Sequence, residues 1–278
     1  MYILIIPLLS YVLPSRSDEW QVNILDVGQG VSVLVIKNNR ALVYDVGAKY
    51  PSGFNMADAV ILPILKAKGI GHIDWLFISH GDNDHAGSLP FLTQGIAVNN
   101  LVTNTDRCQL GFSADWQELN LAVLWPQNPI NYSDNNGSCV MKISDGIHSV
   151  LLPGDIDKSI EQNLVELYGA QLKSTLLLAP HHGSNTSSTT PFIQTVDPEY
   201  VVFSQGFKNR WGFPKADVVT RYLNSGVRHA NLYSISQTGQ VRFVFAGQYS
   251  AKVDILTYRF DLYPYWYANM HNCCANRW

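Results

Sequence analysis

The stretch Ser79-His80-Gly81-Asp82-Asn83-Asp84-His85-Ala86-Gly87 decides the fold. It holds four candidate metal ligands within six residues: His80, Asp82, Asp84 and His85. The apolar run Trp75-Leu76-Phe77-Ile78 precedes it and predicts a short buried strand. A tight loop at the end of such a strand can present oxygen and nitrogen ligands to two neighbouring cations. A merely solvated polar loop rarely has this spacing, so we interpret the stretch as a metal site.

Two later segments repeat this arrangement of an apolar run, a turn and candidate ligands. In Leu151-Leu152-Pro153-Gly154-Asp155 the carboxylate can bridge two ions, although Asp is also a good N-cap for a following helix. In Leu176-Leu177-Leu178-Ala179-Pro180-His181-His182-Gly183-Ser184 two His are adjacent. Neighbouring side chains of an extended chain point to opposite sides. We therefore expect one His to be a ligand and the other to face substrate or solvent.

Two more Asp residues follow strand-like runs near the start of the chain. Asp45 comes directly after Leu42-Val43-Tyr44, and we expect it to orient a ligand or the loop backbone. Asp26 receives the same interpretation on weaker grounds. It begins Asp26-Val27-Gly28-Gln29-Gly30, which has the composition of a tight hairpin turn.

The remaining pattern alternates short apolar runs with helical periodicity. Strands are predicted at residues 21–27, 31–36, 41–46, 121–125, 138–143, 149–152, 175–179 and 200–204. Helices are predicted at residues 56–68, where Pro63 should distort the helix, and at 157–168 and 215–224. This alternation without a long linker predicts a single α/β (α+β) sandwich domain.

Composition limits the function. The chain has 278 residues, 46% of them hydrophobic, enough for a substantial core. Its net charge of −3 argues against a protein that coats nucleic acid through many Lys and Arg contacts. A nuclease stays compatible with this charge, because bound cations supply positive charge where a phosphate would lie.

The chain ends and the four Cys residues carry separate expectations. Residues 1–16 are largely apolar, and we interpret them as the remnant of a transmembrane helix, with a short hydrophobic anchor as the alternative. Residues 251–278 form a C-terminal extension to which we assign no role. Cys108, Cys139 and Cys273-Cys274 lack the C-x-x-C spacing of a zinc site. A disulfide between Cys108 and Cys139 in an oxidising compartment and free thiols both remain open.

Taken together, these motifs resemble the metallo-β-lactamase superfamily. The chain is most similar to the C-terminal domain of ComEC-type DNA-uptake channel proteins. The matching segments occur in the family's order: Leu25–Gly30, Ser79–Gly87, Pro153–Asp155 and Pro180–Ser184. The resemblance implies a metallo-β-lactamase-like αββα sandwich over residues 17–250, with a dinuclear metal site at one edge.

The resemblance also assigns ligands. It implies that His80 and Asp82 hold one ion, that Asp84, His85 and His182 hold the second, and that Asp155 bridges them. His181 would face the substrate as a phosphate contact or proton donor. Asp84 and His181 would thus be the catalytic residues.

This chain departs from the superfamily pattern in three places. Asp82 stands where most members have His, a change expected in ComEC-type domains. No His is evident for the usual ligand before Asp155, so Asn136 or Ser138 would lie there. The segment Asn209-Arg210-Trp211-Gly212-Phe213-Pro214-Lys215 is similar to the family's Asn-Arg-x-Gly-His-Pro, with Phe213 in the His position.

The chemistry that follows is phosphodiester hydrolysis with two divalent ions. Three carboxylates and three imidazoles favour Mn²⁺, with Zn²⁺ and Mg²⁺ as alternatives. Lys208, Arg210 and Trp211 are candidate DNA contacts, or an ordinary solvated surface. The resemblance implies a nuclease on the outer face of the inner membrane that degrades the non-transported strand, with the channel domain, DNA and other competence proteins as partners.

Three alternatives remain. A hydrolase of a small ester, thioester or lactam would use the same ligands. A non-catalytic DNA-binding module, or a purely structural domain of the channel, would need no intact metal site.

Overall fold

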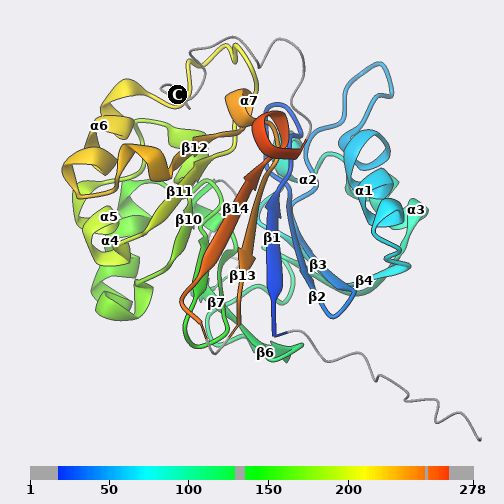
Figure 1. Ribbon diagram of the computed structural model, residues 1–278, viewed down its shortest axis with the longest axis horizontal. Coiled ribbons are helices and arrows are strands. Elements are labelled where there is room, and N and C mark those ends of the chain that lie inside the picture. The colour runs from blue at the N-terminus through cyan, green and yellow to red at the C-terminus, as the bar shows by residue number, and fades with distance from the viewer. Residues whose placement is uncertain (1–17, 129–134, 248–249, 263–278) are drawn as a thin grey trace, which may run out of the picture.

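Two β-sheets lie face to face in the computed structural model, which describes residues 18–128, 135–247 and 250–262 (Figure 1). Within these residues each sheet has seven strands. The first sheet runs in the order β14 (Val253–Thr257), β13 (Val241–Phe245), β1 (Trp20–Ile24), β2 (Val33–Lys37), β3 (Arg40–Tyr44), β4 (His72–Ile78) and β5 (Ala97–Thr103). The second runs β12 (Leu232–Ser234), β11 (Tyr200–Phe203), β10 (Leu176–Leu178), β9 (Ser149–Leu152), β8 (Val140–Ser144), β7 (Leu119–Trp125) and β6 (Ser113–Trp116).

Helices cover the outer face of each sheet (Figure 1). The first sheet is covered by η1 (Ala57–Ile61), α1 (Leu62–Ala67) and α3 (Leu89–Gly95), and the second by α4 (Lys158–Tyr168), α5 (Thr190–Val196) and α6 (Ala216–Asn224). Shorter pieces are α2 (Asn83–Ala86), α7 (Ile235–Thr238), η3 (Asn135–Gly137), η4 (Gly169–Leu172), η5 (Pro180–Gly183), η6 (His229–Asn231) and η7 (Tyr258–Leu262). This is the predicted αββα sandwich.

Alternation along the strands explains the layers. In β2, Val33 and Val35 point into the core between the sheets, while Leu34 points to the outer face and packs with Leu65 of α1. The side-chain period of a strand is two, so an unbroken apolar strand can fill both layers. β3, β9 and β10 are likewise buried at nearly every position, and so on both faces.

Two local predictions need correction or refinement. Residues 26–30 do not form a tight hairpin turn, because β1 ends at Ile24 and β2 begins at Val33. The longer connection is used to bring Gly30 against Asp84, where a Cβ atom would lie 2.2 Å from the Asp84 carbonyl oxygen. The helix predicted at residues 56–68 is divided into η1 and α1, and Pro63 is the second residue of α1.

The ends of the described chain bear on other expectations. Residues 253–257 of the expected extension form β14, which pairs antiparallel with β13. Cys108 and Cys139 form a disulfide with a Cα–Cα distance of 5.8 Å. Residues 1–16 and the Cys273-Cys274 pair lie outside the described residues. Within the part of the chain that is described, no helix has the length and apolar character needed to cross a membrane.

Candidate metal centre

The candidate ligands lie where parallel strands of both sheets end. Asp45 follows β3 and His80 follows the parallel strand β4. In the other sheet, Asp155 follows β9 and His182 follows β10, which is parallel to β9. Since the carboxyl ends of parallel strands meet at one edge, residues far apart in sequence converge.

Five of the predicted ligands converge closely. Ligand atoms of His80, His85 and Asp155 lie within 4.8 Å of one another, and so do those of Asp84, His85 and His182. Nε2 of His85 lies 3.2 Å from Oδ1 of Asp155 and 3.3 Å from Nε2 of His182. Asp84 Oδ2 lies 3.3 Å from Nε2 of His182. The second group has the members expected for one ion, whereas the first places His85, and not Asp82, beside His80 and Asp155.

Each of the three candidate ligand imidazoles is held through its Nδ1 atom. His85 Nδ1 donates to Asp45 Oδ2 at 2.7 Å, and His182 Nδ1 donates to the carbonyl of Ser204 at 2.7 Å. His80 Nδ1 lies 3.0 Å from the Ser79 hydroxyl. The Nε2 atoms are thereby turned toward the cluster, which is how proteins orient His for a metal ion.

Electrostatics divide the cluster into charged and neutral members. Burial lowers the pKa of His182, but Asp155 and Asp84 outweigh it and raise that pKa to about 9. The pKa of His85 is likewise raised well above its usual value, since Asp155 and Asp45 outweigh burial. Burial alone would raise the pKa of Asp84, yet its hydrogen bond with His182 lowers it to about 2. Without metal, protons on His85 and His182 thus offset part of the negative charge of the three neighbouring carboxylates, Asp45, Asp84 and Asp155.

His80 behaves differently and gives the clearest sign that cations fit here. Burial, followed by the nearby His85, lowers the pKa of His80. Its Nε2 atom is buried without a hydrogen-bond partner. Buried polar atoms are nearly always paired, because leaving one unpaired costs about 1–3 kcal/mol. An unpaired imidazole nitrogen in a cluster that also holds Asp155 fits the binding of a cation.

The two adjacent His side chains do not separate as an extended chain would require. His181 and His182 have φ angles of 49° and 56°, in the left-handed region that non-Gly residues seldom adopt. Both rings consequently approach Asp155, with Nε2–Oδ2 distances of 3.7 Å for His181 and 3.4 Å for His182. The ring of His181 is partly exposed beside the cluster. Burial lowers its pKa, which leaves the ring neutral.

Three further predicted residues, Asp82, Asp45 and Asp26, lie at different distances from the cluster. Asp82 lies at the rim, 62% exposed, with Oδ2 3.6 Å from Nε2 of His80. Asp45 touches both a ligand and the loop, because it also accepts hydrogen bonds from the backbone and hydroxyl of Ser79. Asp26 is not brought to the cluster and pairs with Arg259 at 3.2 Å.

Of the two residues proposed for the missing His, Ser138 is the one at the cluster. Its hydroxyl lies 3.4 Å from Nδ1 of His80 and accepts a hydrogen bond from the Asp155 backbone. The side chain of Asn136 instead bonds Asp157, which caps α4. Ser79 and Ser204 had no predicted role, because a Ser carries no ligand signal in sequence.

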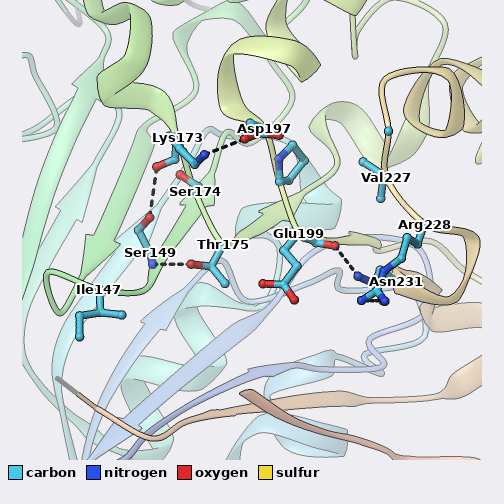
Figure 2. Close-up of a pocket in the computed structure, with 12 residues that line it drawn as sticks. Ile147, Ser149, Lys173, Ser174, Thr175, Asp197, Glu199, Val227, Arg228 and Asn231 are labelled. Carbon is cyan, nitrogen blue, oxygen red and sulfur yellow. Dashed lines mark hydrogen bonds and ion pairs between the residues drawn. The ribbon is translucent and has the colours of Figure 1, made fainter. Parts of the chain in front are cut away.

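A pocket of about 470 Å³ lies at the opposite end of the parallel strands (Figure 2). Its residues lie at the start of β9 and before β10, β11 and β12, whereas the candidate ligands of this sheet follow β9 and β10. Lys173 is paired with Asp197 at 2.7 Å, and Asn231 donates to the Glu199 carbonyl. The charged side chains in this pocket do not converge on a common point as the ligands do.

Comparisons with known proteins agree with this geometry. The family model described as "Metallo-beta-lactamase superfamily" matches residues 25–205. The chain is 34% identical to Recombination protein 2 of Haemophilus influenzae, over 90% of the chain and 32% of that protein. It is 34% identical to Competence protein ComA of Neisseria gonorrhoeae, over 76% of the chain and 30% of that protein. The chain therefore spans about a third of the length of these relatives.

A solved structure extends the likeness to the fold. The metallo-β-lactamase fold protein YhfI from Bacillus subtilis matches with a TM-score of 0.51 and 12% identity. The match covers 82% of this chain and 99% of that one. At this identity the likeness concerns the fold alone.

Proposed function

Because this chain belongs to the metallo-β-lactamase superfamily, we propose that it is a metal-dependent phosphodiesterase domain that cuts DNA. The observation that carries the proposal is the cluster of three imidazoles and two carboxylates in which the buried Nε2 atom of His80 has no hydrogen-bond partner. The competence name of the gonococcal relative supports DNA as the substrate. The domain would belong to a larger membrane protein that takes up DNA, with the channel part of that protein as its partner.

The residues have distinct tasks in this proposal. His80, His85, Asp155, Asp84 and His182 would hold the ions, with Asp82 at the rim. When bound, two divalent cations would lower the pKa of a water molecule and offset charge on the phosphate. Asp45 and the Ser204 carbonyl keep His85 and His182 turned inward. His181, neutral and partly exposed beside Asp155, would contact the phosphate or supply a proton.

The metal preference is inferred from the ligand atoms, and the location from the disulfide. Three carboxylates with three imidazoles favour Mn²⁺ over Zn²⁺, because oxygen donors suit harder cations. The buried disulfide between Cys108 and Cys139 favours an oxidising compartment, which supports a position on the outer side of the membrane.

A nuclease assay across metals tests this function. The purified chain should cut labelled DNA with Mn²⁺ and leave a panel of small esters, thioesters and lactams intact. Asp84→Ala should abolish cutting, whereas Asp26→Asn should retain it, because Asp26 pairs with Arg259. Elemental analysis of each variant reports metal per chain. Full nuclease activity in Asp84→Ala, or turnover of a small substrate alone, would reject the proposal.

A further inference from the structure

The loop at residues 206–215, here named the stacking loop, lies beside the candidate metal centre. It follows β11 and leads into α6. Its Lys215 N–H donates to the carbonyl of Gly183, the residue after the ligand His182. Contact is close, since a Cβ atom on Gly183 would lie 2.6 Å from Cβ of Pro214. The stacking loop therefore forms one wall of the centre.

Internal hydrogen bonds hold the stacking loop in shape. Asn209 donates to the carbonyls of Gly206 and Phe213 and accepts from the N–H of Phe213. The Lys215 ammonium donates to the carbonyl of Trp211. A loop tied in this way presents its side chains without a large ordering cost on binding.

Planar groups form a continuous row from the centre to the surface. The ring of Phe213 stacks on His182, with centroids 6.4 Å apart and planes at 21°. Trp211 stacks on Phe213 at 6.2 Å and 11°. The Arg210 guanidinium lies 4.3 Å from the Trp211 ring centroid. The row ends at the solvent with the planar Arg210 guanidinium over Trp211, which is 41% exposed.

The same loop exposes a second ring and carries only positive charge. Phe207 is 71% exposed, and the Lys208 ammonium lies 5.4 Å from its ring centroid. Residues 206–215 contain three basic side chains and no acidic one: Lys208, Arg210 and Lys215. Exposed aromatic rings interleaved with cations suit a ligand that offers both flat apolar faces and negative charge.

We propose that the stacking loop binds unpaired nucleotide bases, so that the nucleic acid is held at the centre as a single strand. This inference deepens the proposed function and rests on it. Phosphates of single strands and of duplexes both contact cations, but only an unpaired base can place its face on Trp211 or Phe207. In a duplex those faces are covered by neighbouring base pairs. Binding by stacking also tolerates any base sequence.

Binding measured without hydrolysis tests the inference. Fluorescence anisotropy of a labelled oligothymidine and of a duplex of equal length would be followed with the full chain in EDTA. We expect tighter binding of the single strand. Trp211→Ala and Phe207→Ala should each weaken it by about 5- to 150-fold, the range that loss of one base stack implies.

Matched variants separate stacking from charge and from damage to the fold. Trp211→Phe should restore most of the affinity and Trp211→Leu should not, because only the former keeps a flat ring. Arg228→Ala, at the far pocket of Figure 2, removes one Arg and should leave binding unchanged, unlike Arg210→Ala. Thermal unfolding and metal content check that each variant is intact.

Two outcomes would overturn the inference. One is equal or tighter binding of the duplex, and the other is loss of affinity in Arg210→Ala with none in Trp211→Ala, which indicates phosphate contact only. Because no cutting is needed, ring-dependent binding can hold even if the nuclease assay fails. Conversely, Mn²⁺-dependent cutting can hold while the stacking loop proves irrelevant.

Discussion

Asp45 accepts a hydrogen bond of 2.7 Å from Nδ1 of His85, and neither side chain is exposed to solvent. The same carboxylate accepts the backbone N–H and the hydroxyl of Ser79. These three donors point at two oxygens, so the carboxylate fixes both the His85 ring and the loop that follows β4. The proton on Nδ1 leaves Nε2 of His85 available to a metal ion.

Asp45→Asn should weaken metal binding by about 10- to 100-fold, the usual effect of removing a group that orients a ligand His. An amide offers one acceptor oxygen where the carboxylate uses two, so either Ser79 or His85 loses its partner. Competition with a fluorescent chelator measures the affinity. Asp26→Asn is the matched control and should bind metal normally. Equal affinity of both variants would show that Asp45 does not orient the site.

How far the sequence could predict this site is clear from Asp45 and Asp26. Each follows an apolar run, and both received the same interpretation, yet only Asp45 reaches the cluster. β3 pairs directly with β4 and ends beside it, whereas β1 runs in the same direction but is separated from β3 by β2. The order of strands across the sheet decides which strand ends are neighbours, and that order depends on pairings distant in sequence.

The strands β5 and β13 were not predicted from the sequence. β5 carries Asn99 and Asn100 at its middle and is largely exposed at the edge of its sheet, so it lacks the apolar pattern of a buried strand. β13 pairs with β1, more than 200 residues earlier in the chain, at Phe245 and Trp20. The strands that lead into the candidate ligands were predictable because their burial on both faces gives continuous apolar runs.

Metal affinity should rise with pH. In the metal-free protein the pKa of His182 is about 9, so at pH 7 its imidazole must lose a proton before it can bind an ion. Release of one proton gives a slope of about tenfold in apparent affinity per pH unit between pH 7 and 9. The pKa of His85 is also raised, so release of its proton on metal binding would make this slope steeper. Chelator competition at pH 7, 8 and 9 measures the slope, which His182→Gln should reduce. An affinity independent of pH would contradict this.

Gly30→Ala should disturb the centre although Gly30 is not a ligand. Its φ is +132°, and an added Cβ would lie 2.2 Å from the backbone oxygen of Asp84. We expect a loss of about 1–3 kcal/mol in the free energy of unfolding, with weaker metal binding as Asp84 shifts. Urea denaturation and chelator competition measure the two effects. Gly81→Ala, where an added Cβ meets nothing within 4 Å, should change neither. Identical behaviour of the two variants would refute this account.

Reduction of the disulfide between Cys108 and Cys139 should destabilise the domain. The bond closes a loop with a sequence separation of 31 residues, for which the loss of chain entropy in the unfolded state predicts about 4 kcal/mol. Urea denaturation with and without reductant should show most of this difference. The Cys108→Ser, Cys139→Ser double variant should match the reduced protein. A reduced protein as stable as the oxidised one would argue against the bond.

Glu161 should make the protein less stable as the pH rises toward neutrality. Its carboxylate on α4 is buried and accepts the N–H groups of Ser188 and Thr189. Burial outweighs these bonds and raises its pKa from 4.5 to about 7. Between these pH values the folded chain keeps a proton that the unfolded chain has released. The contribution of Glu161 to the free energy of unfolding is therefore greatest below pH 4.5. It falls by about 3 kcal/mol as pH rises to 7.

Urea denaturation of the metal-free protein between pH 5 and 8 tests this, in wild type and in Glu161→Gln. Other groups titrate alike in both proteins, so the difference between their unfolding free energies isolates Glu161. Wild type should lose stability relative to Glu161→Gln up to pH 7 and then run parallel to it. Glu166→Gln, on the exposed side of the same helix, should track wild type throughout. A constant difference between wild type and Glu161→Gln would mean that the buried carboxylate stays ionised across this range, because its two backbone donors then outweigh burial.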